Sequence, residues 1–228
     1  MWQEIVNVYS DFDTFGRIDM LILALMSIYM WGLFVAKYVY FNKLEEANEH
    51  LAKRLREFRA QFVRDFTQMY RDLPKTSDAP VYRMYRAGMD FLFAEGPAST
   101  SDIEETSQIM DAALSKEINE MEGGLTFFSV TAMLAPMMGL FGTVWGLTLS
   151  FRGMVGSGNT TISTVAPGIS VALITTVAGL IVAIPAAAIF YYFRGRVNCQ
   201  IVLMEEYAKL LTARLHRALE KEKQSENN

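Results

Sequence analysis

Two long apolar segments dominate the second half of the chain. They lie between Gly123 and Phe193, a short polar loop separates them, and neither contains Asp, Glu, Lys or Arg. Each is long enough to cross a hydrocarbon layer of roughly 30 Å, which takes ~20 helical residues. The pattern therefore predicts transmembrane helices at residues 124–151 and 164–193.

An earlier apolar run predicts a further transmembrane helix at residues 17–41. Asp19 and Lys37 mark its edges, and at 1.5 Å per residue they are about 27 Å apart, close to the hydrocarbon thickness. We interpret Asp19 as a boundary charge at the membrane surface, with a proton-binding site as the alternative. Large apolar side chains cover this helix nearly all round, which predicts that it faces lipid.

The charged residues are concentrated outside these three segments. Residues 42–123 and 194–228 hold most of them and show helical periodicity, with breaks near Leu73–Pro80 and Glu95–Pro97. The amphipathic helix that ends near Met121 is expected to continue into the second crossing.

Lysine and arginine placement predicts the orientation. These residues follow the first and third crossings, whereas the 152–163 loop contains only Arg152. The positive-inside rule then places 42–123 and 194–228 in the cytoplasm. The loop 152–163 and a surface helix at residues 1–16 are expected outside, in the periplasm. The predicted fold class is an all-α integral membrane protein whose second and third helices extend into a cytoplasmic helical bundle.

Composition argues against several soluble functions. The chain is 51% apolar and 20% charged, with a net charge of −4 and no basic patch interleaved with aromatics, so nucleic-acid binding is not expected. The lone Cys199 allows no internal disulfide. His50 and His216 lack metal-ligand spacing with each other or with Cys199. We predict no enzyme activity, no metal and no cofactor.

Small residues recur every three or four positions along the second and third crossings. Such stripes allow two helix backbones to approach closely. Tight packing alone is one interpretation. The other is a narrow wet path, because Thr143 and Thr176 would place hydroxyl groups at mid-membrane depth. A hydroxyl can donate and accept hydrogen bonds, but it cannot hold a proton as a carboxylate does.

Two motifs resemble the MotA/TolQ/ExbB proton-channel family. Gly139-Leu-Phe-Gly-Thr-Val-Trp-Gly146 is similar to the second-helix signature of its TolQ and ExbB members. Val165-Ala-Pro-Gly-Ile169, with Thr176 and Ala183-Ile-Pro-Ala186, is similar to their third helix. The predicted spans, orientation and length extend the resemblance over nearly the whole chain, and length favours the TolQ branch.

The resemblance implies a proton-driven motor. Members form a homopentamer in the inner membrane of Gram-negative bacteria, around two copies of a single-span TolR/ExbD-like partner. Proton flow would energise a TolA- or TonB-like periplasmic protein, with Thr143 and Thr176 lining the pore and a transmembrane Asp of the partner titrating. The residues implied to pack the helices at the pore are Gly139, Gly142, Gly146, Pro167, Gly168, Ala172 and Gly179.

Val171 departs from the resemblance, because TolQ and ExbB usually carry Glu at the matching position. The run Val171-Ala-Leu-Ile-Thr-Thr176 is instead similar to the flagellar stator subunit MotA. A MotA-type stator is therefore an alternative, although MotA has a fourth span and none is visible here. A non-conducting membrane scaffold, in which the small-residue stripes only pack helices, is the alternative from another class.

Overall fold

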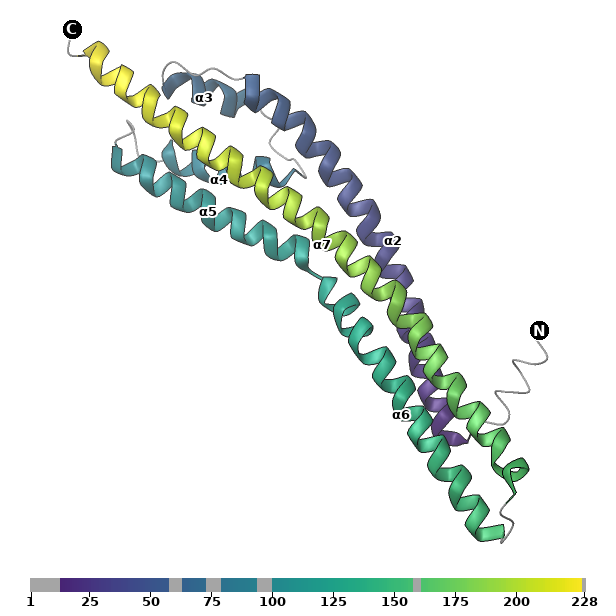
Figure 1. Cartoon of the computed structure of the whole chain (residues 1–228). Helices are drawn as coiled ribbons and strands as arrows, with labels where there is room; N and C mark the ends of the chain where they lie inside the picture. The colour runs from purple at the N-terminus through teal and green to yellow at the C-terminus, as the bar shows by residue number, and fades with distance from the viewer. Residues whose placement is uncertain (1–12, 58–62, 73–78, 94–99, 158–160, 227–228) are drawn as a thin grey trace. The chain divides into compact units, whose positions relative to one another are not determined.

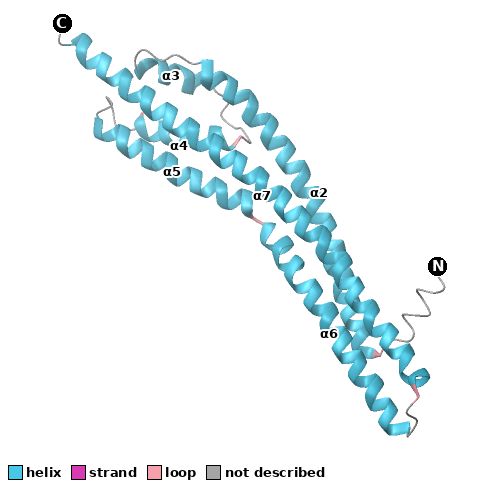
Figure 2. Ribbon diagram, in the orientation of Figure 1, coloured by secondary structure: helices cyan, strands magenta, loops and turns pink. Residues whose placement is uncertain are grey.

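In a computed structural model, residues 13–57, 63–72, 79–93, 100–157 and 161–226 are described. These described residues are almost all helical, with no strand among them (Figure 2). The helices are α2 (Thr14–Glu57), α3 (Val63–Asp72), α4 (Pro80–Leu92), α5 (Thr100–Glu122), α6 (Leu125–Ser157) and α7 (Ile162–Glu226).

The chain divides into two compact units. We call residues 1–36 and 124–193 the apolar unit, and residues 37–123 and 194–228 the polar unit. Among the described residues, three helices are long and apolar enough to cross a membrane, and the qualifying segments begin at Thr14, Leu125 and Val165. They belong to α2, α6 and α7, as the three predicted crossings require.

The apolar unit consists of parts of α2, α6 and α7, which lie side by side (Figure 1). Its core is formed by Leu23 of α2, Ala135 of α6, and Val182 and Ala183 of α7. Two of these four side chains are single methyl groups, so the helices are held by close approach rather than by large interlocking side chains.

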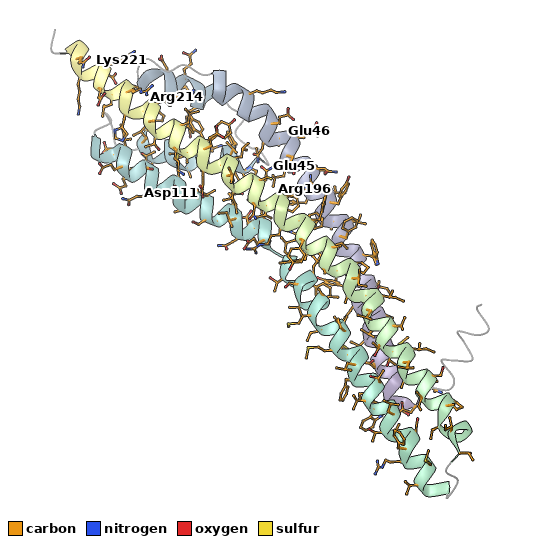
Figure 3. The ribbon with its side chains drawn as sticks, in the orientation of Figure 1. Glu45, Glu46, Asp111, Arg196, Arg214 and Lys221 are labelled. Carbon is orange, nitrogen blue, oxygen red and sulfur yellow. The ribbon has the colours of Figure 1, made fainter. Side chains whose placement is uncertain are left out.

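The polar unit has a different interior. Phe66, Met84, Tyr85, Met89, Ile103 and Met110 are fully buried there. Ion pairs tie its helices together at the edges. Arg83 of α4 binds Glu117 of α5, with 2.7 Å between Arg83 Nε and Glu117 Oε1. Arg196 of α7 binds Glu45 of α2, and Figure 3 labels both side chains.

The prediction that the helix before the second crossing continues into it is wrong. α5 ends at Glu122, a turn follows at Gly123 and Gly124, and α6 begins at Leu125. Gly124 has φ of 79°, a left-handed conformation that glycine adopts without steric cost and that commonly terminates helices. The third crossing does continue without a break, because α7 runs from Ile162 to Glu226.

Helix ends also differ from the predicted boundaries. α6 extends to Ser157, so residues 152–157 of the predicted loop 152–163 are helical. α2 extends past residue 41 to Glu57. Most of the predicted surface helix at residues 1–16 lies outside the described residues, and α2 already begins at Thr14. The predicted break at 95–97 and most of the one at 73–80 lie outside the described residues, and α4 already begins at Pro80.

Candidate functional site

Three glycines of α6 form the contact with α7. A Cβ atom built on Gly139 would lie 2.7 Å from the carbonyl oxygen of Thr175, and one on Gly146 would lie 2.9 Å from Cβ of Ala172. A Cβ on Gly142 would lie 2.7 Å from Thr175 Oγ1. Because backbone lies opposite Gly139, a side chain there would force the two helices apart. We call this contact the α6–α7 seam.

The seam continues at both ends through other predicted residues. Gly168 of α7 faces the side chain of Ser150, and Gly179 faces the carbonyl group of Ala135. Pro167 is exposed, while Val171 is half-buried and lies one helical turn before Thr175. The glycines and Ala172 thus pack two helices of one subunit against each other. That the seam also borders a pore stays a prediction.

Threonine hydroxyls supply the polar contacts of the seam. Thr176 Oγ1 donates to the carbonyl oxygen of Gly139 across the helix pair, at 3.1 Å. Thr175 is buried, and its Oγ1 lies 2.6 Å from the carbonyl of Ala172 in its own helix and 3.2 Å from that of Gly139. One hydroxyl proton serves one of these acceptors at a time. Two hydroxyl groups of α7 thus lie within hydrogen-bond distance of the Gly139 carbonyl oxygen.

The two predicted pore threonines differ in their surroundings. Thr143 is 7% exposed, and its Oγ1 donates to the Leu140 carbonyl of the same helix, at 2.7 Å. Thr176 is half-buried and bonds to the other helix. No role was predicted from the sequence for the hydroxyl group of Thr175. Its position beside Thr176 was the only signal.

Asp19 of α2 also reaches the seam. Its side chain is 3% exposed, and Oδ2 would lie 3.1 Å from a Cβ built on Gly142. The carboxyl group is therefore packed between helices, and its position at the boundary of the membrane stays a prediction. The prediction that helix 1 simply faces lipid was incomplete, because Asp19, Leu23 and Met30 lie on a buried face at steps of four and seven residues.

The Asp19 carboxyl group has an unusual environment. Its Oδ2 is buried and has no hydrogen-bond partner. The groups that surround it are apolar side chains, Gly142 and the Thr175 hydroxyl, which itself lies 2.7 Å from the position of a Gly142 Cβ. Within the described residues, no group of three or more His, Cys, Asp or Glu side chains could hold a metal ion. The seam therefore offers hydroxyls, carbonyls and one carboxyl group, which are groups that can bind water and protons.

These features define a class: a helical membrane protein whose spanning helices pack through glycines and share buried hydroxyl groups. The sequence profile of the MotA/TolQ/ExbB proton channel family matches residues 76–206, more than half of the chain. The chain belongs to this family. The matched residues include all of α6 and the part of α7 up to Glu206, so they include the whole α6–α7 seam.

Relatives from two branches of the family are similar to the chain. The Tol-Pal system protein TolQ of Pseudomonas aeruginosa is 35% identical over 67% of this chain and 69% of its own length. TolQ of Haemophilus influenzae is 30% identical over 88% of this chain and 89% of its own length. The biopolymer transport protein ExbB of Salmonella typhimurium is 40% identical, but over only 34% of this chain and 32% of its own length.

Proposed function

We propose that the chain is the channel-forming subunit of a motor driven by the proton-motive force in the bacterial inner membrane. Five copies surround the spanning helices of two TolR/ExbD-like partners, and the assembly energises a periplasmic protein. Family membership and three apolar helices support this proposal. The similarity to TolQ extends over most of the chain and that to ExbB over a third, which favours a TolA-like effector over a TonB-like one.

The proposed orientation follows from the basic residues. Lysine and arginine gather after the first and third spans, which favours a cytoplasmic position for the polar unit and the C-terminus. The N-terminus and the connection between α6 and α7 are then periplasmic.

The observation that carries the proposal is the row of threonine hydroxyl groups along the α6–α7 seam. Thr176 and Thr175 both reach the Gly139 carbonyl, and Thr143 lies on α6 one turn further along. Hydroxyl groups at this depth can hold water molecules that deliver protons to a carboxyl group on the partner helix. One proton that crosses 100 mV releases roughly 2.3 kcal/mol, so a few protons can drive a conformational cycle.

Proton flux into vesicles tests the proposal. The chain is co-purified with its co-encoded single-span partner, reconstituted, and energised with a potassium diffusion potential. We expect Thr143→Val and Thr176→Val to reduce proton flux at least tenfold, while size-exclusion profiles show an assembled complex. Thr148→Val is the matched control, because Thr148 is exposed and its hydroxyl bonds only to Val144 of its own helix.

Two results would count against the motor. Wild-type flux in both seam variants would remove the threonines from the proton path. A ring that excludes the partner and conducts no protons would favour the scaffold.

A further inference from the structure

Asp19 is the one acidic side chain in the described residues that is buried among the helices of the apolar unit. It is 3% exposed and its Oδ2 has no hydrogen-bond partner. Gly142 of α6 lies opposite Asp19, and a Cβ atom built on Gly142 would contact both Asp19 Oδ2 and Thr175 Oγ1. The three helices thus enclose a carboxyl group close to a hydroxyl group.

The charged groups nearest in sequence do not neutralise Asp19. Arg17 and Asp13 lie near Asp19 at the beginning of α2. Arg17 is exposed and lies about 200° around the helix from Asp19. Asp13 accepts a hydrogen bond from Trp145 Nε1 at 3.0 Å. α6 carries only Arg152, which is exposed, and α7 carries no charged residue before Arg194. An isolated carboxylate in such surroundings is costly, whereas the protonated acid is neutral.

We infer that Asp19 is a proton-binding site of this subunit, neutral while the α2–α6–α7 contact is closed. The protonated carboxyl gains an O–H donor, and the Thr175 oxygen retains acceptor capacity when its own proton goes to a backbone carbonyl. Release transfers the proton to a water molecule, which leaves a carboxylate and a hydronium ion. Uptake is the reverse of that step. Both need water at Asp19, so the proton exchanges only when the contact opens.

The surroundings of Asp19 offer a route for that opening. Asp19 forms part of the wall of an open apolar groove between α2 and α6, together with Phe15, Ile22, Met137 and Phe141. Because Asp19 itself lines this groove, a small movement of α2 would admit water to the carboxyl group. Proton binding at Asp19 does not depend on the proposed motor. Its use in the cycle would rest on that function.

Infrared spectroscopy of the whole chain in lipid nanodiscs tests the inference without a partner or a gradient. We expect a carbonyl stretch of a protonated carboxylic acid at pH 7 that shifts when aspartate is isotopically labelled. Asp19→Asn should remove this band, because the amide has the same shape but no acid. The matched control Asp13→Asn should retain it. Transfer to heavy water should shift the band slowly, as the proton exchanges.

Three results would overturn the inference. The first is the absence of an aspartic-acid band in the wild type at pH 7, a measurement that remains valid even if Asp19→Asn does not fold. The second is a band that never shifts in heavy water, which means a neutral carboxyl that exchanges no proton. The third is a carboxylate signal with sodium-dependent thermal stability, which indicates a cation site. If Thr143→Val and Thr176→Val leave proton flux unchanged, the proposed motor function fails, but the expected infrared bands of Asp19 stay the same.

Discussion

The two units of the chain hold their helices together with different kinds of residue. The apolar unit joins its helices through glycine, alanine and threonine, and backbone carbonyls take part in the contacts. The polar unit uses Met, Phe and Tyr side chains inside and arginine–carboxylate pairs at the edges. In lipid, the hydrophobic effect does not favour contact between apolar helices, so their association depends on close approach of the backbones. In water, burial of large apolar side chains stabilises the folded state.

The difference has a functional consequence. Among the described residues, two buried side-chain oxygens lack a hydrogen-bond partner, Asp19 Oδ2 and Thr131 Oγ1, and both belong to the apolar unit. In the polar unit, charges are paired and partly exposed, so they act as structural contacts. The comparison predicts that small changes in volume damage the apolar unit, while changes in charge damage the polar unit.

The largest expected effect comes from filling the seam. Gly139→Leu places a Cβ 2.7 Å from the Thr175 carbonyl and 2.9 Å from the Thr176 Cα. Backbone cannot rotate away as a side chain can, so we expect a loss of more than about 3 kcal/mol and little monodisperse protein. Gly32→Leu is the control in the same unit, because nothing lies within 4 Å of its Cβ position. Equal yields for the two variants would contradict the seam.

A smaller loss should follow from removing a charge in the polar unit. The Glu117 side chain is 5% exposed and binds Arg83, which is 37% exposed and also lies 3.7 Å from Glu120. Glu117→Ala should lower the free energy of unfolding by about 1–3 kcal/mol, since Arg83 keeps a second partner. Glu49→Ala breaks an exposed pair with Lys53 and should change stability by less than about 1 kcal/mol. Thermal unfolding measures both, and an equal change in Tm would refute the distinction.

The smallest effect concerns alkaline pH. Burial raises the pKa of the Tyr85 phenol in the polar unit. A raised folded-state pKa contributes stability below the unfolded value of about 10, and this stability is lost as pH rises above it. Tyr85→Phe loses the hydrogen bond to the Phe66 carbonyl and should cost about 1 kcal/mol at pH 7. Its stability should then fall less than that of the wild type above pH 10. Parallel pH profiles would contradict this account.

Sequence reasoning predicted the three spans because apolar runs of this length have few alternatives. It missed the break between α5 and α6, although adjacent Gly123 and Gly124 were a visible signal for a helix end. The helical residues after 151 were also missed, because the loop was predicted to begin at residue 152.

The burial of Asp19 could not be read from the sequence. Helix 1 carries large apolar residues on most faces, so its pattern does not reveal which face packs against α6 and α7. The sequence also did not show which residue of α7 lies opposite each seam glycine, because the register between α6 and α7 depends on tertiary contacts. The small-residue stripes indicated a close contact and left its location open.

Water access to Thr176 is the most direct test of the central claim that the seam borders a proton path. Thr176→Cys is made in a Cys199→Ser background, since Cys199 is exposed and free, and the assembled complex is treated with a small water-soluble thiol reagent. Met133→Cys, on an exposed apolar position of α6, is the comparison. The account predicts that the thiol at 176 reacts and the thiol at 133 is protected. A reactive thiol at 133 with an inert one at 176 would contradict it.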